Sequence, residues 1–458
     1  MTHQIDMRML KGFVCIYRRN FEIFLLICTM GIACVLLTHH VRSAIKDVGY
    51  DRQLNMAQAA APQQTSTPDP RQIRNGYLKS MLNCYDHPLQ MEQMQYGHYW
   101  LLKNLIRGRL SANMGCAESI TYTTNGDYTF MDNLAEVVTR WMGPVSIALF
   151  APGHDFNATM DSIQYARNCL PHSFLIREYV TFHIYFPNDH MPPQRVPLNE
   201  EEALEWPYDC QLEEAPYEHV DRSSMYKTQK NLTYPINVGR NIARKAANTY
   251  FIFPCDIELY PSRGVIEQFL NMAYENITLV SPSYDGSKLR VYVLPVFELQ
   301  AKAKIPNNKK ELVPMLRNKQ AIAFHYRVCK NCHVVPDQDK WINATYSDDL
   351  VVFTVAKRQK KYVYWEPFYI SDNREPLFDE RVTWEGQSNK RIQNYAMCLL
   401  DYEYHVLHPA FLVHSPGIKK FDPKSERQKY VRPMNKFIEK KIKPEYAVLY
   451  GTNKGCRV

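Results

Sequence analysis

The sequence predicts an α/β fold with a mostly parallel central sheet, and two features of its pattern support this. Apolar stretches of strand length recur in the chain, and segments with helical periodicity separate them. Strands are expected at residues 119–124, 145–150, 179–186 and 250–253. Strands that alternate with helices become parallel neighbours, because right-handed crossovers connect them. Ligands of such sheets bind beyond the carboxyl ends of the strands.

The helices between these strands have apolar residues spaced three and four apart. They are expected at residues 131–141, 158–168 and 238–246, with further helical segments between residues 77 and 110. In the third helix the apolar stripe leaves Arg240 and Asn241 on another face. Asn237 stands where an N-cap belongs, because its side-chain oxygen can accept from the amides of a first turn.

Two carboxylates follow the strand at residues 250–253. Asp256 and Glu258 are two residues apart on an extended segment, so both side chains point the same way and could share one hard cation. The same spacing recurs at residues 337–339 and 401–403, and taken alone each of the three pairs is better explained as an ordinary solvated pair than as a metal site. Only Asp256 and Glu258 end a strand that follows a capped helix, and they are therefore candidate metal ligands.

The N-terminal part of the chain is typical of a membrane-anchored protein. Residues 21–38 (FEIFLLICTMGIACVLLT) are almost uninterrupted apolar sequence, which predicts a transmembrane signal anchor rather than a buried core helix. The basic residues before it favour a cytoplasmic tail at residues 1–20. Residues 39–76 are rich in Ala, Gln, Thr and Pro and are expected to form a stem. Residues 77–458 would then be a lumenal domain.

Sequons and cysteines also favour a lumenal domain. Nine of the 12 cysteines follow the apolar stretch, and an odd number leaves at least one thiol unpaired or linked to another chain. Cys329 and Cys332 precede His333, and we expect a structural disulfide that involves one or both of them, because haem attachment or zinc would need another compartment or a second ligand pair. The Asn-X-Ser/Thr sequons are at Asn157, Asn231, Asn276 and Asn343.

The charge pattern does not predict a nucleic-acid partner. The net charge is +8, but most of the excess lies in one segment at residues 418–444. That segment has no Arg-Gly, aromatic-interleaved or finger-type pattern. The sequence also lacks a Gly-X-Gly-X-X-Gly or Walker loop, which argues against dinucleotide-binding and P-loop proteins.

Several blocks of the sequence, in order, are similar to one family. They are TNGDYTFMDNLAEVVTRWMGPVSIALFAPGHDF, PINVGRNIARKAA, DIELYPS, VYVLPVFE, WEPFYI, LFDERV and HVLHPAFLVH. They resemble the glycosyltransferase family of the β-1,4-glucuronyltransferase that primes O-mannosyl glycans and of the C-terminal domain of the bifunctional xylosyl- and glucuronyltransferases. The resemblance runs from about residue 120 to the C-terminus. It implies a GT-A fold, a nucleotide-sugar donor, a divalent cation such as Mn²⁺, inversion at the anomeric carbon and a type II Golgi membrane protein.

The resemblance also implies roles for single residues. Asp256 and Glu258 match the Asp-X-Asp that holds the metal against the donor diphosphate, with Glu in the second place. His414 matches the third metal ligand, although a hydrogen-bonded core histidine is the alternative. The residues expected to contact the nucleotide sugar are Thr123, Thr124, Asn237, Arg240, Asn241, Lys419 and Lys420. The two threonines could equally be ordinary residues at the end of a strand.

A transferase of this kind needs a general base for the acceptor hydroxyl. Asp379 matches the aspartate of the LFDERV block, and we predict that it is this base. Glu380, Glu366 and Glu385 are the alternatives. A loop salt bridge with Arg381 would be the structural explanation of Asp379.

The reaction implied by the resemblance is transfer of glucuronic acid from UDP-glucuronate to a xylose-terminated glycan on a glycoprotein, as in protein O-mannosylation. The sequence departs from the family after Gly386, where Gln387 and Ser388 replace an expected aromatic residue with one apparent addition, and at Ala396, where the family has Glu. Two alternatives therefore stay open. One is a different donor or acceptor sugar, and the other is a catalytically weak lumenal partner of active transferases.

Overall fold

The computed structural model describes residues 69–280, 288–418 and 427–458. The predicted signal anchor, Lys419 and Lys420 lie outside these residues. Within the described ranges, no helix combines the length and apolar character needed to cross a membrane. The first described helix is α2 (Pro70–Leu82), whose Leu78 and Leu82 are buried. Its residues 70–76 belong to the segment predicted as stem.

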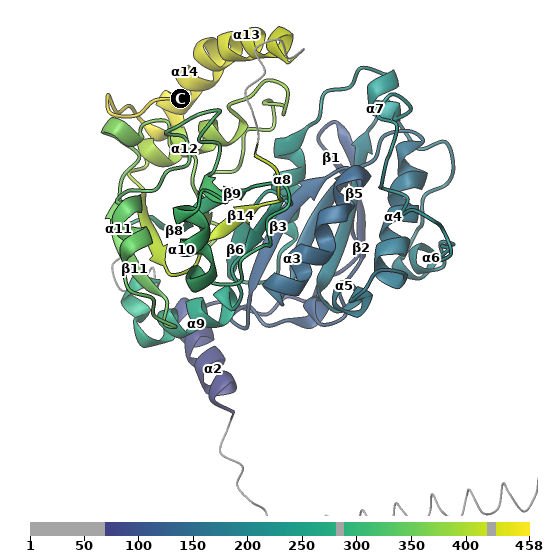
Figure 1. Ribbon diagram of the computed structural model, residues 1–458. Coiled ribbons are helices and arrows are strands. Elements are labelled where there is room, and N and C mark those ends of the chain that lie inside the picture. Colours follow the sequence, from purple (N-terminus) through teal and green to yellow (C-terminus); the bar gives the residue numbers. More distant parts are fainter. Residues whose placement is uncertain (1–68, 281–287, 419–426) are drawn as a thin grey trace, which may run out of the picture. The chain divides into compact units, whose positions relative to one another are not determined.

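One six-stranded sheet is built from strands between residues 92 and 254 (Figure 1). Its strands lie in the order β1-β2-β5-β4-β3-β6, and the pairs β5–β4, β4–β3 and β3–β6 are parallel. All four predicted strands are confirmed as members of this sheet. They are β3 (Ile120–Gly126), β4 (Val145–Phe150), β5 (Val180–Pro187) and β6 (Phe251–Pro254).

Helices cover both faces of this sheet. The side chains of β4 show it, because Ile147 and Leu149 pack in the main core, whereas Ala148 and Phe150 pack in a second cluster with residues of one helix. That helix is α8 (Ile236–Ala246), while α3 (Leu134–Trp141) and α4 (Asp155–Asn168) contribute to the main core. The three predicted helices are confirmed, although a 3₁₀ turn forms the start of the first.

A hairpin replaces most of the helical structure that was expected between residues 77 and 110. The expectation is confirmed for residues 77–82, which belong to α2, and it is wrong for residues 92–106. β1 (Glu92–Tyr96) and β2 (Tyr99–Ile106) pair antiparallel. Gly97 makes the turn with a φ of +58°, which glycine adopts without steric cost. β2 pairs on its other side with β5. A partner strand far along the chain therefore decides the conformation, and local periodicity does not reveal it.

The second half of the chain forms two smaller mixed sheets that the sequence did not predict. Their strand orders are β10-β9-β14-β7 and β11-β13-β8-β12, with parallel pairs only at β14–β9 and β13–β8. The strands are β7 (Leu259–Pro261), β8 (Arg290–Leu294), β9 (Val296–Leu299), β10 (Ala321–Ala323), β11 (Val351–Ala356), β12 (Phe368–Ile370), β13 (Glu403–His408) and β14 (Leu412–His414). The α/β class is thus confirmed, but parallel pairing dominates only around β3, β4 and β5.

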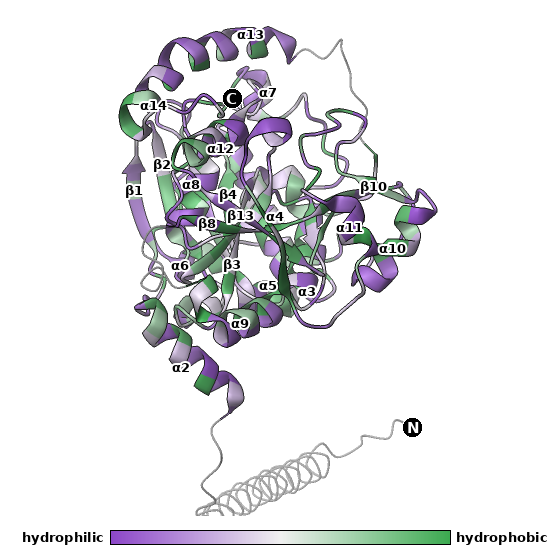
Figure 2. Cartoon of the chain, turned by 90° about the vertical axis from the view of Figure 1, so that its left-hand side faces the viewer, coloured by the Kyte–Doolittle hydropathy of each residue, from purple (hydrophilic) through white to green (hydrophobic). Residues whose placement is uncertain are grey.

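The remaining helices surround these sheets. Figure 2 shows that the interior strands are mostly hydrophobic, whereas α13 is mostly hydrophilic. The remaining α-helices are α5 (Ser173–Tyr179), α6 (Glu200–Leu204), α7 (Tyr226–Gln229), α9 (Val265–Glu275), α10 (Lys309–Arg317), α11 (Gln338–Asn343), α12 (Asn389–Leu399), α13 (Gln428–Phe437) and α14 (Lys443–Tyr450).

Disulfides account for eight of the nine cysteines that follow the apolar N-terminal stretch. Cys255 is the unpaired one, and its thiol is buried. The expectation of a structural disulfide that involves Cys329, Cys332 or both is confirmed, because the two are bonded to each other, and the expectation of an unpaired thiol is also confirmed. The bonds are Cys84–Cys116, Cys169–Cys210, Cys329–Cys332 and Cys398–Cys456.

Candidate active site

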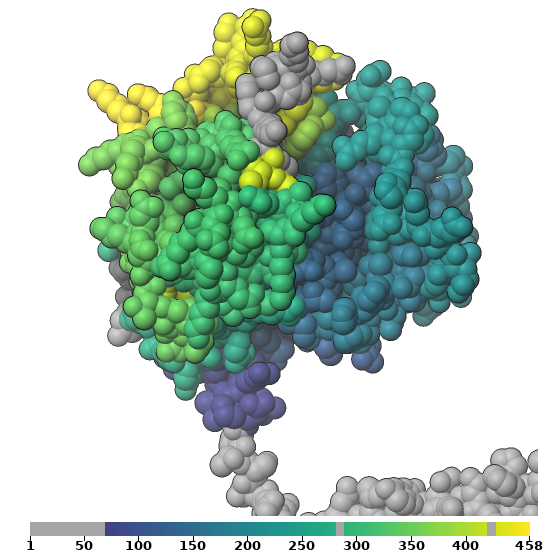
Figure 3. Space-filling view, viewed as in Figure 1, coloured from purple at the N-terminus to yellow at the C-terminus, as the bar shows by residue number. Residues whose placement is uncertain are grey.

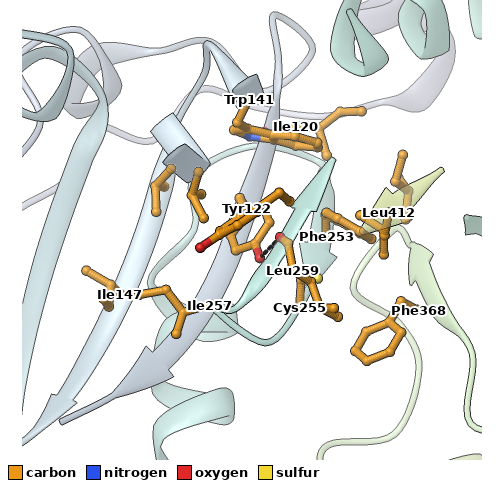
Figure 4. Close-up of a cluster of buried hydrophobic side chains, with 14 of the residues drawn as sticks. Ile120, Tyr122, Trp141, Ile147, Phe253, Cys255, Ile257, Leu259, Phe368 and Leu412 are labelled. Carbon is orange, nitrogen blue, oxygen red and sulfur yellow. Dashed lines mark hydrogen bonds between the residues drawn. The ribbon is translucent and has the colours of Figure 1, made fainter. Parts of the chain in front are cut away.

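The turn that carries Asp256 and Glu258 is held firmly at the carboxyl end of β6. The hydroxyl of Tyr122, on β3, donates to the carbonyl oxygens of Asp256 at 2.7 Å and Leu259 at 2.9 Å. Figure 4 shows Tyr122 reaching Leu259 from within a packed cluster of aromatic and aliphatic side chains. On the other side, the amide of Ser415 donates to the carbonyl oxygen of Glu258 at 2.8 Å. The two carboxylates therefore sit on a braced backbone.

His414 lies beside this turn because β14 pairs with β7, which places His414 opposite Leu259. Its Nδ1–H donates to the carbonyl oxygen of Ser415 at 2.7 Å. Its Nε2 is buried, has no hydrogen-bond partner among the described residues, and lies 3.7 Å from Oε1 of Glu258. An imidazole held through Nδ1 with Nε2 open is the usual arrangement of a metal-ligating histidine. His414 and Glu258 thus fit a divalent cation.

Asp256 is engaged by two cations. Its Oδ1 accepts from Nη2 of Arg240 at 2.8 Å, and its Oδ2 accepts from Nζ of Lys390 at 2.7 Å. Burial would raise the pKa of Asp256, but the charges of Lys390 and Arg240 outweigh it and hold this pKa well below its ordinary value. Asp256, Glu258 and His414 are thus neighbours, yet nowhere in the described chain do three metal-ligating side chains converge on one point.

A cavity of about 620 Å³ joins these residues, a volume in the range of small-molecule and cofactor sites. Its lining residues come from α8, the turn after β6, residues 324–333 and 366, residues 384–391, β14 and the start of the C-terminal segment at residues 427–428. Figure 3 shows the face of the molecule on which the green part of the chain adjoins the blue and teal part. The ionisable residues that line the cavity are Arg240, Asp256, Glu258, His325, His333, Glu366, Lys390, Arg391, His414 and Arg427.

Glu366 is the one candidate base that lines this cavity. Its Oε1 accepts from Nε and Nη2 of Arg391 at 3.0 and 2.9 Å. Burial would raise the pKa of Glu366, but the charge of Arg391, with smaller effects of His333 and Lys390, lowers it. Its backbone is pinned as well, because its amide donates to the carbonyl oxygen of Cys332 at 2.8 Å. An ionised carboxylate is therefore presented to the cavity.

Asp379, the predicted base, lies outside the lining of the cavity and is buried. Its carboxylate accepts from Nε of Arg381 at 2.9 Å and from Nη2 at 2.7 Å, and the hydroxyl of Tyr446 donates to it at 3.3 Å. Glu380 and Glu385 are engaged elsewhere, with the hydroxyl of Tyr96 and the amide of Tyr234. The structure therefore contains the salt bridge between Asp379 and Arg381 that was considered as the alternative to a catalytic role. The role of Asp379 as the general base stays a prediction.

The sequence profile of one family matches this chain over residues 119–451, and the family is described as glycosyl-transferase for dystroglycan. The chain belongs to this glycosyltransferase family. It is 27% identical to Beta-1,4-glucuronyltransferase 1 of Mus musculus over 362 residues, which cover 77% of this chain and 80% of the relative. It is also 27% identical to Xylosyl- and glucuronyltransferase LARGE1 of Danio rerio over 220 residues, 48% of this chain and 27% of that protein. The predicted resemblance and the prediction of an enzyme are thus confirmed.

Of the helix residues predicted to contact the donor of this glycosyltransferase, only Arg240 lines the cavity. Asn237 is not an N-cap, because α8 begins at Ile236 and Pro235 occupies the cap position. Its side-chain Nδ2 instead donates to the backbone carbonyl oxygen of Asp379 at 2.8 Å. The side-chain Nδ2 of Asn241 donates to the backbone carbonyl oxygen of Phe378 at 2.8 Å. Both side chains therefore fasten α8 to the segment around Asp379.

Thr123 and Thr124 do not end their strand, because β3 continues to Gly126. This corrects the expectation that they mark the end of the first strand. Both side chains are buried, and neither hydroxyl has a hydrogen-bond partner among the described residues. Neither residue lines the cavity. A contact between these threonines and the uridine of a donor stays a prediction.

The segment where the sequence departs from the family forms one wall of the cavity. Gln387 and Ser388 have φ values of +59° and +57°, a conformation that residues with a side chain rarely adopt. They lead into α12, where Oδ1 of Asn389 accepts from Nη1 of Arg240 at 2.8 Å and Lys390 reaches Asp256. Asn389 and Lys390 were not among the site residues predicted from the sequence.

Proposed function

We propose that this glycosyltransferase moves glucuronic acid from UDP-glucuronate to a xylose-terminated glycan on a glycoprotein, with inversion at the anomeric carbon and a GT-A type of fold. The observation that carries the proposal is the cavity at the end of β6, where Asp256 and Glu258 lie with the open nitrogen of His414. The names of the similar glucuronyltransferases support the choice of sugar.

The charge of the cavity supports an anionic donor. Four cationic side chains, of Arg240, Lys390, Arg391 and Arg427, line it against the three carboxylates of Asp256, Glu258 and Glu366. A positive excess attracts the diphosphate and the carboxylate of UDP-glucuronate.

Glu258 and the open nitrogen of His414 would hold a divalent cation such as Mn²⁺, and Asp256 would join them once one of its oxygens is released from its present partner, because carboxylates and imidazole are suitable ligands for such a cation. When bound, the cation would neutralise charge on the leaving diphosphate. Arg240 and Lys390 lie on the same wall and would bind the diphosphate oxygens as charge-assisted donors.

We assign the proton transfer to Glu366 in preference to Asp379. The acceptor hydroxyl must lose its proton as the bond to the anomeric carbon forms, so the base has to reach the cavity. Glu366 lines the cavity, whereas the carboxylate of Asp379 is closed off by Arg381 and Tyr446.

A donor screen tests the proposed function. The purified protein is incubated with Mn²⁺, a xyloside acceptor and single UDP-sugars, and released UDP is measured. We expect release with UDP-glucuronate that depends on the xyloside. Acceptor-dependent release with another UDP-sugar alone would favour the alternative of a different donor, and no acceptor-dependent release with any sugar would favour a catalytically weak partner of other transferases.

We further propose a type II Golgi membrane protein anchored by residues 21–38. The asparagines of all four sequons are exposed on the surface of the described domain, at Asn157, Asn231, Asn276 and Asn343, as glycosylation in the lumen requires. Endoglycosidase treatment is expected to increase the gel mobility of the protein expressed in animal cells. A variant with Gln at all four positions is the control and should run at the deglycosylated position. Unchanged mobility, or digestion of the domain by protease in sealed vesicles, would contradict this topology.

A further inference from the structure

Both oxygens of the Asp256 carboxylate are occupied by side chains of this protein. Arg240 holds Oδ1 and Lys390 holds Oδ2, at 2.8 and 2.7 Å. The carboxylate is also accessible from the cavity, since 31% of the Asp256 side chain is exposed. A ligand that needs an oxygen of Asp256 must therefore compete with one of these two cations.

The two cations are held very differently. Nη1 of Arg240 also donates to Oδ1 of Asn237 at 3.0 Å and to Oδ1 of Asn389 at 2.8 Å, so its guanidinium is fixed from three sides. The ammonium of Lys390 makes its one hydrogen bond within the described residues to Asp256, and it rests 4.0 Å from the ring centre of Phe368. A lysine on a flexible stem with a single partner is the one that can leave.

A divalent cation at Asp256 is incompatible with Lys390 in its present position. Metal–oxygen distances are about 2.0–2.6 Å, so a metal bound to Oδ2 would lie next to an ammonium that is hydrogen-bonded to the same oxygen. Two positive charges at such a short distance repel each other strongly where the effective dielectric constant is low. The ammonium would have to turn into the cavity, where a diphosphate supplies new acceptors.

We propose that Lys390 is an exchangeable counter-cation, which neutralises Asp256 in the donor-free protein and moves to the diphosphate of the nucleotide sugar when a divalent cation takes its place. This inference rests on the proposed function. Through this exchange, Lys390 couples the binding of the divalent cation to the binding of the diphosphate. The cation alone must displace Lys390 without compensation, whereas the diphosphate gives the displaced ammonium a new partner. The strained turn at Gln387 and Ser388 sets the start of α12, from which Lys390 reaches Asp256.

The test measures affinities rather than turnover. Detergent-solubilised full-length protein and its Lys390→Met variant are titrated by calorimetry with Mn²⁺ alone, and then with UDP at saturating Mn²⁺. We expect Lys390→Met to bind Mn²⁺ alone about tenfold more tightly, because a competing charge is gone, and to bind UDP about tenfold more weakly. A lysine that only stabilised the fold would not change the two affinities in opposite directions.

Two further variants make the test decisive. Lys390→Gln, a polar neutral replacement, is expected to behave as Lys390→Met, and it serves if the methionine variant does not fold. Arg427→Met removes another cation of the cavity, one that lies over the ring of Trp384 at 3.7 Å and does not contact Asp256. Its affinity for Mn²⁺ is expected to stay within about twofold of wild type, since it does not occupy the carboxylate.

The results separate this inference from the proposed function. The inference alone would be overturned if the wild-type protein binds Mn²⁺ and UDP but the folded Lys390 variant binds Mn²⁺ no more tightly than wild type. An equal increase in Mn²⁺ affinity in the Arg427 variant would also overturn it, because the increase would then come from the total positive charge of the cavity and not from the contact with Asp256. Wild type that binds neither Mn²⁺ nor UDP would overturn both.

Discussion

Asp256→Asn is expected to abolish sugar transfer, with a loss of about 10³-fold or more in kcat. The substitution removes a full negative charge from the wall where the cation and the diphosphate are proposed to bind. The fold should persist, because the side chain is partly exposed and Arg240 keeps its hydrogen bonds to Asn237 and Asn389. Release of UDP and calorimetric Mn²⁺ binding measure the loss, and thermal unfolding checks the fold.

The chain contains a matched control for this variant. Asp339 belongs to another Asp-X-Asp pair, is exposed, and lies at the start of α11, away from the lining of the cavity. Asp339→Asn makes the same chemical change and should leave transfer within about twofold of wild type, as surface substitutions usually do. Retention of more than a tenth of the activity by Asp256→Asn would refute the role of this carboxylate.

Glu366→Gln is expected to reduce kcat by about 10²- to 10⁴-fold, the usual loss when a general base is removed. Binding of Mn²⁺ and UDP should stay near wild type, because Glu366 contacts Arg391 and not Asp256. Single-turnover measurements at saturating donor would separate the chemical step from binding.

Asp379→Asn is the companion variant, and its expected phenotype is different. It weakens the hydrogen bonds from Arg381 and Tyr446, so we expect a loss of about 1–2 kcal/mol in the free energy of unfolding with most of the activity retained. The opposite pair of results would return the role of general base to Asp379. In that case Glu366→Gln would be active, and Asp379→Asn would fold normally but lose about 10²- to 10⁴-fold in kcat.

The local pattern of the sequence was sufficient for the parallel part of the first sheet and for the helices that pack on it. The strands β3 to β6 and the helices α3, α4 and α8 were predicted because a buried strand or an amphipathic helix carries its period within its own residues. The hairpin β1–β2 and the short strands β7, β10, β12 and β14 were not predicted. Each has three to eight residues and owes its conformation to a partner strand elsewhere in the chain.

For the site, the sequence by itself determined where Asp256 and Glu258 stand, because the end of a parallel strand is a local feature, and the resemblance added His414. Only the tertiary structure decided what surrounds them. Lys390 is 134 residues from Asp256 in the chain, yet its ammonium holds one of the carboxylate oxygens. Asp379 likewise became a buried partner of Tyr446, 67 residues away. The state of a carboxylate depends on the charges and donors that packing brings to it, and packing between distant elements leaves no period in the sequence.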